Sequence, residues 1–374
     1  MNATELNLGF SEQVTFALRS LYNRYGYSQY KMSKFEEYDL YARNKDFLIS
    51  DSVITFTDLS GKLMALKPDV TLSIVKNSTD TPDGLQKLYY NENVYRVSKG
   101  SHAFREIMQV GLECLGRIDD YCIAEVIELA ARSLNSISPR SILDISHLGL
   151  LSQFISSMGI PREEQDGVLR CIGEKNLHEL TAICRASGMA PDDVELIARL
   201  VTLSGGAGEV LPQVEQLLRG RVDQDMLDHF TRSLRALSGS AIGDMLRIDF
   251  SVVDDIHYYN GFVFKGFIDG LPSSVLSGGQ YDKLMRKMGR RSGAIGFAVY
   301  TDLIERLEQP GSEYDVDTVL LYDSDADLNI LRSRIEVLRA GGSVLAQRQV
   351  PAGIKFRRLL KLQGSEVAEI ENNA

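Results

Sequence analysis

The sequence predicts an α+β protein in which a helical insertion splits a mainly antiparallel sheet core and a small α/β domain follows at the C-terminus. Its 374 residues exceed what one ordinary hydrophobic core holds, so at least two domains are expected. Strand-like alternation occurs in residues 1–146 and again in 241–310, which we assign to the core. Residues 147–240 change to helical spacing with short loops, and 315–374 form the α/β unit.

The N-terminal part of the core predicts a helix followed by a hairpin. Residues 9–25 place apolar side chains at helical spacing, and Gly26 can end that helix. In residues 52–66, β-branched and aromatic side chains surround a glycine turn, which is typical of a β-hairpin. Pro68 then ends the second strand, and we expect a helix over 71–77.

Two long strands are predicted next, over residues 86–97 and 105–117. In the second strand, alternation puts Gln109 and Glu113 on one face together with apolar residues. That face is therefore not a purely apolar core. The remaining core elements are a helix over 120–135 and strands over 141–146, 246–253, 261–268 and 293–299.

The tail after Pro310-Gly311 predicts a strand, a helix and a strand, over residues 318–322, 326–340 and 343–347. A basic stretch follows, Lys355-Phe356-Arg357-Arg358 with Lys361. We interpret this stretch as a solvated amphipathic helix, because the chain as a whole is acidic. A contact surface for a protein partner is the functional alternative.

Composition argues against several classes of function. The 41 Lys and Arg against 51 Asp and Glu give a formal charge of −10, which repels a polyanion at long range. No apolar run approaches the roughly 18–20 residues that cross a bilayer. The N-terminus, Met1–Glu5, lacks the basic and apolar regions of a signal peptide. We therefore expect a soluble, cytoplasmic protein.

Metal and cofactor motifs are missing from the sequence. The four cysteines form no CxxC pair, which favours reduced thiols in the core. The five histidines are scattered without the spacing of metal ligands, and there is no GxxxxGK[ST] phosphate loop. We predict that the chain holds neither a metal nor a cofactor.

Five segments are each weak evidence alone but form an ordered set. By itself, Ser277–Asp282 could be any glycine turn, and Arg96 could be an ordinary surface charge. In chain order the segments are Leu66–Thr71, Tyr89–Arg96, Phe104–Glu113, Ile256–Phe264, and Ser277–Leu284 with Ala294–Ala298. Over residues 9–308 this order resembles the catalytic core of class II aminoacyl-tRNA synthetases, specifically histidyl-tRNA synthetase.

The resemblance implies a pocket for histidine. Carried over by position, its lining residues are Asp69, Thr71, Arg96, Gln109, Glu113, Tyr258 and Tyr259. Carboxylates suit an ammonium or imidazole donor, arginine suits a carboxylate or phosphate, and tyrosines supply ring contacts and hydroxyls. Asp69 stands where the family has Glu, which makes this side chain one methylene shorter.

The departures from the family pattern concern catalysis. Amino-acid activation builds negative charge on phosphate in the transition state, so cations must be placed against it. Of three arginines that the family uses, Arg96 remains, whereas Leu303 and Asp254 occupy the other two positions. A carboxylate in place of a cation changes attraction into repulsion. The loop after Val97 also lacks the family's His-Glu-Arg-Pro pattern. We therefore predict no catalytic residues and no aminoacylation.

A histidine pocket without activation machinery resembles the regulatory subunits of ATP phosphoribosyltransferase, which share the synthetase fold. The resemblance implies a non-catalytic subunit that accompanies a short-form catalytic subunit in a hetero-octamer and is needed for its activity in the first step of histidine biosynthesis. It also implies feedback inhibition by histidine, bound either in the synthetase-like pocket or at a surface shared with the partner. A self-dimer through the class II core is expected as well, although Met32-Ser33 stand where the family has a proline at the dimer interface.

Two other functions stay open on the sequence. One is a divergent, synthetase-like adenylating enzyme, against which Asp254 and Leu303 argue. The other is a translation-linked protein that senses uncharged tRNA through its tail. This second function needs a basic face, and the formal charge of −10 makes tRNA an unlikely partner.

Overall fold

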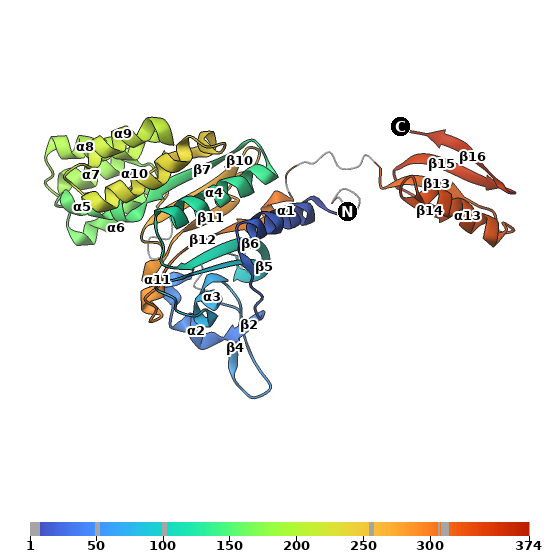
Figure 1. The fold of residues 1–374 in the computed structure, drawn as a ribbon, viewed down its shortest axis with the longest axis horizontal. Helices are drawn as coiled ribbons and strands as arrows, with labels where there is room; N and C mark the ends of the chain where they lie inside the picture. The colour runs from blue at the N-terminus through green and yellow to red at the C-terminus, as the bar shows by residue number, and fades with distance from the viewer. Residues whose placement is uncertain are drawn as a thin grey trace. The chain divides into compact units, whose positions relative to one another are not determined.

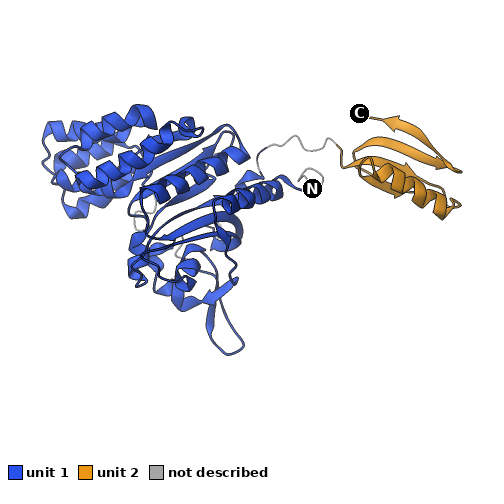
Figure 2. Cartoon of the chain, viewed as in Figure 1, with its two compact units in different colours: residues 1–307 blue, residues 308–374 orange. Residues whose placement is uncertain are grey.

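A computed structural model describes residues 8–48, 53–98, 103–253, 258–305, 307 and 314–373. The chain divides into two compact units, residues 1–307 and 308–374 (Figure 2). Each unit has its own sheet and its own buried side chains, so each is described by itself.

Unit 1 is built around one large sheet (Figure 1). Its strands are β1 (Ser28–Gln29), β5 (Leu85–Val97), β6 (Phe104–Gly116), β7 (Ser141–His147), β8 (Ser204–Gly206), β9 (Leu246–Asp249), β10 (Phe262–Ile268), β11 (Leu276–Gln280) and β12 (Gly293–Tyr300). Within the described residues these nine strands lie in the order β1-β5-β6-β12-β11-β10-β7-β9-β8. Neighbours are antiparallel except for β1–β5 and β7–β9, so the sheet is mainly antiparallel, as predicted.

Two long helices, α1 (Phe10–Arg24) and α4 (Asp120–Ile137), cover one face of this sheet. The alternation of β6 explains why, because Val110, Leu112 and Cys114 all point into the core beneath these helices. The opposite face is packed by a second apolar cluster. The elements on that side are β2 (Phe35–Glu37), α2 (Tyr38–Ala42), η2 (Lys45–Phe47), β3 (Thr55–Thr57), β4 (Leu63–Leu66), α3 (Thr71–Asn77) and α11 (Asp282–Lys287). A short helix, α12 (Thr301–Ile304), follows β12.

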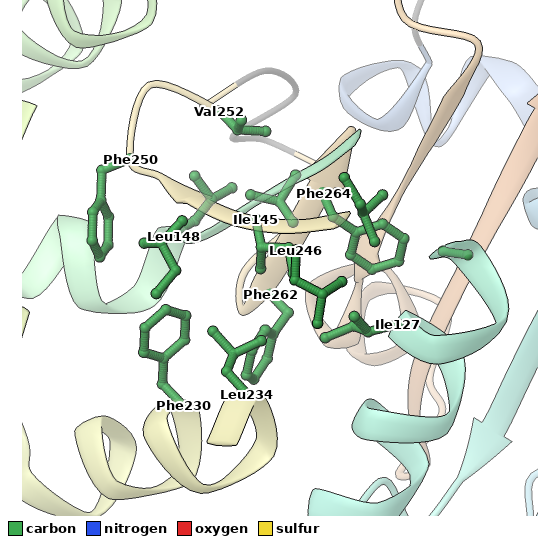
Figure 3. Close-up of a cluster of buried hydrophobic side chains, with 14 of the residues drawn as sticks. Ile127, Ile145, Leu148, Phe230, Leu234, Leu246, Phe250, Val252, Phe262 and Phe264 are labelled. Carbon is green, nitrogen blue, oxygen red and sulfur yellow. The ribbon is translucent and has the colours of Figure 1, made fainter. Parts of the chain in front are cut away.

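The helices between β7 and β9 gather at one end of the sheet (Figure 1). They are α5 (Leu148–Ser157), α6 (Arg162–Gly173), α7 (Leu177–Ala186), α8 (Pro191–Thr202), α9 (Ala207–Leu218), α10 (Gln224–Ser238) and η3 (Gly243–Met245). Figure 3 shows Phe230 of α10 between Phe250 and Phe262, and its ring centroid lies 5.4 Å from that of Phe262 in β10. The helices and the sheet thus share one core. The division of this unit into a core and an insertion stays a prediction.

Two details of unit 1 differ from the sequence-based expectations. No strand was expected over Ser277–Gln280, but this segment belongs to β11, in the middle of the sheet. Glycine is needed there because a Cβ at Gly278 would lie 2.4 Å from the Cβ of Phe297 on β12. The helical stretch 147–240 also contains a strand, β8, which pairs with β9 at the sheet edge.

Unit 2 is a four-stranded sheet with one helix. Its elements are β13 (Val316–Leu321), α13 (Leu328–Arg339), β14 (Val344–Gln347), β15 (Phe356–Gln363) and β16 (Glu366–Asn372). The order is β14-β13-β15-β16, and β13 is parallel to both of its neighbours. The helix predicted for the basic stretch Lys355–Lys361 is wrong, because Phe356–Lys361 lies in β15. This strand packs against the rest of the unit through the buried side chains of Leu359, Leu360 and Leu362.

Of the described helices, none has the length and apolar composition required to cross a membrane. All four cysteines are buried and free.

Candidate functional site

A small cavity lies on the face of the large sheet opposite α1 and α4, over β5, β6, β12 and β11. Its volume is about 40 Å³, which exceeds the roughly 10–15 Å³ that one ordered water needs. The lining residues are Asp69, Thr71, Tyr90, Arg96, Gln109, Glu113, Tyr258, Tyr259, Ser277, Tyr281, Gly296, Phe297, Ala298 and Tyr300. All seven residues that the sequence predicted for the pocket are therefore brought together here.

The strand register explains how distant segments meet. Across four neighbouring strands, Tyr90 pairs with Gly111, Gly111 with Ala298, and Ala298 with Ser277. Paired residues point to the same face of a sheet, and small residues in the middle of this row leave room above them. A Cβ at Gly111 would lie 2.5 Å from the hydroxyl of Tyr90, so this glycine lets the tyrosine extend across the strand.

The start of α3 supplies two of the lining residues. Asp69 Oδ1 accepts a hydrogen bond of 2.8 Å from the backbone nitrogen of Leu72, in the first turn of the helix. Arg96 Nε donates to the carbonyl oxygen of Pro68 at 3.1 Å. These two contacts hold the turn before α3 against β5, and they place Thr71 over β6.

Glu113 is the most enclosed ionisable group of the cavity, with 2% of its surface exposed. Thr71 Oγ1 donates to its Oε1 at 2.7 Å, and the hydroxyl of Tyr281 donates to its Oε2 at 2.6 Å. A Cβ at Gly296 would lie 1.8 Å from Oε2, so the carboxyl occupies space that only glycine leaves. Burial raises the pKa of Glu113 to about 8, and the charge of Asp69 raises it further, against the effect of the two hydroxyl donors.

Tyrosine rings enclose the cavity. Tyr90, Tyr258 and Tyr281 are buried, and burial raises the pKa of each hydroxyl well above its usual value, so all three stay neutral. The ring of Tyr258 lies 4.8 Å from that of Tyr259 and 5.8 Å from that of Tyr281. The wall thus offers aromatic contact and hydroxyl groups at the same time.

The charges in the cavity suit a small zwitterion. Among the described lining residues, Arg96 is the one permanent cation, and Asp69 and Glu113 are the carboxyl groups. Arginine can receive a carboxylate, and the two carboxyl groups can receive an ammonium or a ring N–H donor. Of the two positions where the sequence lacks an arginine, Leu303 on α12 packs against the hydrophobic core, and Asp254 lies outside the described residues.

Sequence reasoning missed part of the site. Ser277 and Tyr300 form a hydrogen bond of 2.8 Å in the cavity wall, and Tyr281 holds Glu113. Tyr281 lies inside the segment Ser277–Leu284 that carried the resemblance, so a signal was available. The described residues contain no group of three or more His, Cys, Asp or Glu that could hold a metal ion.

The comparison with protein families decides the assignment. A family model described as histidyl-tRNA synthetase matches residues 8–304, which is most of the chain. The chain belongs to the histidyl-tRNA synthetase family. The class II synthetase-like fold expected from the sequence is thereby confirmed.

Curated relatives similar to this chain are named ATP phosphoribosyltransferase regulatory subunit and not synthetase. A protein of Oceanobacillus iheyensis named ATP phosphoribosyltransferase regulatory subunit is 26% identical, covering 79% of this chain and 74% of the relative. Another of the same name, from Clostridium kluyveri, is 27% identical over 89% of this chain and 87% of the relative. The predicted resemblance to this group is confirmed.

Solved structures share the fold. A Bacillus halodurans protein described as ATP phosphoribosyltransferase regulatory subunit/histidyl-tRNA synthetase matches with a TM-score of 0.75 at 22% identity, covering 94% of this chain and 93% of that one. Histidyl-tRNA synthetase from Nostoc matches with a TM-score of 0.73 at 16% identity, covering 96% and 93%. A chain of the HisG:HisZ complex of ATP phosphoribosyl transferase from Thermotoga maritima matches with a TM-score of 0.62 at 19% identity, covering 78% and 97%.

Proposed function

We propose that this chain is the regulatory subunit of an ATP phosphoribosyltransferase and acts in the first step of histidine biosynthesis. It binds a short-form catalytic subunit, which needs it for activity, and it makes that subunit sensitive to histidine. The observation behind this proposal is a synthetase-family pocket in which Arg96 is the one cation among the described lining residues. The names of the curated relatives support the same role.

The charge of the pocket is the physical reason to propose that the chain does not form an adenylate. Phosphoryl transfer depends on cations placed against the phosphates. Leu303, at the position of one family arginine, is an apolar residue packed against the core, and the chain carries Asp254 at another such position. An amino acid can still bind to the pocket, because that requires only the carboxyl groups, Arg96 and the tyrosine wall.

Histidine is the proposed ligand of this cavity. We propose that lining side chains move when histidine enters, because most of the residues in the cavity wall are buried. Tyr259 is half-buried, in contrast to the buried Tyr258 beside it, and we propose that it moves first. The coupling between histidine and the catalytic partner is then reciprocal, typically about 1–3 kcal/mol.

Reconstitution tests the role as a subunit. The full chain is mixed with a short-form catalytic subunit, and the formation of phosphoribosyl-ATP is followed with and without histidine. We expect the chain to bind the catalytic subunit, to raise its activity and to introduce inhibition by histidine. Histidine-dependent ATP–pyrophosphate exchange by the chain alone would instead establish the adenylating enzyme and remove the proposal.

Three variants test the pocket as the effector site. Arg96→Ala and Gln109→Ala remove lining groups, and Arg105→Ala is the matched control, because Arg105 is the exposed register partner of Arg96 on β6. We expect the first two variants to weaken histidine binding and inhibition by tenfold or more, and the control to leave both unchanged. Undiminished inhibition in both pocket variants would place the effector at a surface shared with the partner.

We also propose that the chain dimerises through its class II core within a hetero-octamer. Sedimentation of the chain alone and with its catalytic partner measures both states. A monomer of the chain at micromolar concentration would contradict the self-dimer.

A further inference from the structure

The three-stranded sheet of unit 1 turns an apolar face away from the rest of the unit. Its strands lie in the order β2-β4-β3 at the end where α2 and α3 lie (Figure 1), and opposite residues on antiparallel strands point to the same face. On one face, Glu36 accepts from Ser73 Oγ at 2.8 Å and pairs with Lys76 Nζ at 2.6 Å, so this face is turned toward α3. The opposite face, called the outward face below, carries the apolar side chains of Phe35, Ile54, Phe56, Met64 and Leu66.

This arrangement inverts the usual polarity of a surface sheet. An antiparallel sheet with one face on a core normally turns apolar side chains inward and polar ones to water. Here the face toward α3 carries Glu36, Thr55, Thr57, Leu63 and the buried Ala65. None of the five apolar side chains of the outward face belongs to, or packs against, an apolar cluster of the described residues. Packing within the described part of the chain thus does not account for the outward face.

Two phenylalanine rings form the centre of the outward face. Phe35 is 47% exposed and Phe56 is 38% exposed, and their ring centroids lie 5.3 Å apart in an edge-to-face arrangement. The two rings come from the outer strands and meet over β4, the strand of Met64 and Leu66. Aromatic residues and methionine are enriched in the cores of protein–protein interfaces, and contiguous exposed apolar surface marks such contacts. The outward face therefore has the composition of a docking surface.

The charges around the outward face are balanced. Of the six described residues that the register puts on this face, Glu37 is the ionisable one, and it forms an ion pair of 2.6 Å with Lys62. Lys34 and Asp58, next to the ends of β2 and β3, add one charge of each sign. The whole chain has a formal charge of −10, so two copies repel each other at long range. A neutral, apolar surface is the place where a copy can approach, and such a surface matches itself across a two-fold axis.

We propose that a second copy of this chain docks on the outward face. The inference deepens the proposed self-dimer and rests on it, because it names the side chains that such a dimer buries. Two outward faces meet across a two-fold axis, and the rings of Phe35 and Phe56 leave water to contact the apolar side chains of the other copy. The ion pairs of Glu37 with Lys62 lie at the rim of the contact, where they stay hydrated.

Sedimentation equilibrium of the full chain measures the docking. Phe56→Glu places a charge at the centre of the outward face, whereas Thr57→Glu is the matched control, because Thr57 is the next exposed residue of β3 and points to the other face. We expect Phe56→Glu to weaken self-association about thirtyfold or more, and Thr57→Glu to change it by less than about threefold. Urea unfolding checks that each variant is folded. Phe56→Ala adds no charge and should weaken self-association about tenfold, so it replaces Phe56→Glu if that variant does not fold.

Thiol labelling gives a second readout, because all four native cysteines are buried. Glu37→Cys puts a thiol on the outward face and leaves every apolar side chain there in place. Thr57→Cys is its matched control on the other face. The reaction of Glu37→Cys with a maleimide should slow severalfold as the protein concentration rises through the dissociation constant of the dimer. Thr57→Cys should react at the same rate throughout.

The possible failures can be told apart. If the chain dimerises and both Phe56 variants dimerise as tightly as the native chain, the inference is overturned and the self-dimer stands. If these variants lose the catalytic subunit and keep the dimer, the outward face binds that subunit instead, and the inference is overturned as well. Labelling of Glu37→Cys that is equally slow at every concentration would assign the face to a contact within one chain, with the same consequence. If the native chain is a monomer both alone and in its complex, the proposed self-dimer is overturned together with the inference.

Discussion

Lys67 is fully buried, and its Nζ donates to Oε2 of Glu92 at a distance of 2.9 Å. The pair joins the turn between β4 and α3 to strand β5. The backbone of Lys67 reinforces this connection, because its carbonyl oxygen accepts from Tyr95 and its nitrogen donates to Lys34. The turn that ends at Asp69 is thus fixed to the strand that carries Arg96.

Removing this buried cation should be costly. We expect Lys67→Met to lower the free energy of unfolding by about 3–5 kcal/mol, because it leaves the carboxylate of Glu92 largely buried without a partner. The control is Lys62→Met, which breaks an ion pair of 2.6 Å with Glu37 whose side chains are about half exposed. That change should cost at most about 1 kcal/mol. Urea unfolding measures both, and equal losses would contradict the importance of burial.

A methyl group at Gly296 should destabilise the fold and disturb the cavity. Its Cβ would lie 1.8 Å from Glu113 Oε2 and 2.4 Å from the carbonyl oxygen of Leu112. We expect Gly296→Ala to cost about 2–3 kcal/mol or more and to abolish histidine binding. Gly208→Ala is the control, because Gly208 lies in α9 with nothing within 4 Å, and there alanine should stabilise by about 0.5–1 kcal/mol.

Glu113 should make the folded state less stable as the pH rises. Its pKa is about 8 in the folded chain and about 4.3 in an unfolded one, so between these values the folded state binds more protons. The free energy of unfolding from this group therefore falls as the pH rises from about 4.3 to 8. Urea midpoints at pH 5.5 and 8 should show that Glu113→Gln gains stability relative to the native chain at the higher pH. The same difference in stability between Glu113→Gln and the native chain at both pH values would contradict this expectation.

His147 should act in the opposite direction and at lower pH. It is 3% exposed between Phe230 and Phe262, and its Nδ1 accepts from the nitrogen of Leu150 at the start of α5. Burial lowers its pKa to about 3, whereas an unfolded histidine has a pKa of about 6.5. The unfolded state then binds more protons between these values, so stability falls by up to about 1.4 kcal/mol for each pH unit below 6.5.

Unfolding in urea from pH 7 to pH 5 measures this loss. His147→Asn keeps an acceptor for the Leu150 nitrogen and should remove most of the pH dependence in this range. His178→Asn changes an exposed histidine in α7 and should leave the dependence intact. A slope that survives His147→Asn would assign the effect to another group.

Elements with a strong local pattern were predictable from the sequence. The helix over 71–77 was placed correctly, because Pro68 ends the preceding strand and an apolar run follows. The two long strands, β5 and β6, were predictable from their alternation. In contrast, Phe356–Lys361 combines charges with apolar residues, and its pairing with β13 on one side and β16 on the other makes it a strand.

The residues that line the candidate site were predictable from the sequence, but their contacts with one another were not. The seven residues that the resemblance selected line one cavity, although their role in binding histidine stays a prediction. Tyr281 and Gly296 contact Glu113 from parts of the chain that are far away in sequence. Such contacts depend on the register of β11 and β12 against β6, which no local pattern specifies.

The short strand β8 has a consequence for engineering this chain. It comes from within the helical stretch, and it pairs through Ser204–Gly206 with β9, the strand next to it in the large sheet. Deletion of the whole helical stretch would also remove β8, and the backbone N–H and C=O groups of β9 would then be exposed to other molecules. A shortened chain made in that way should aggregate edge to edge, so versions for crystallisation should keep residues 204–206 in place.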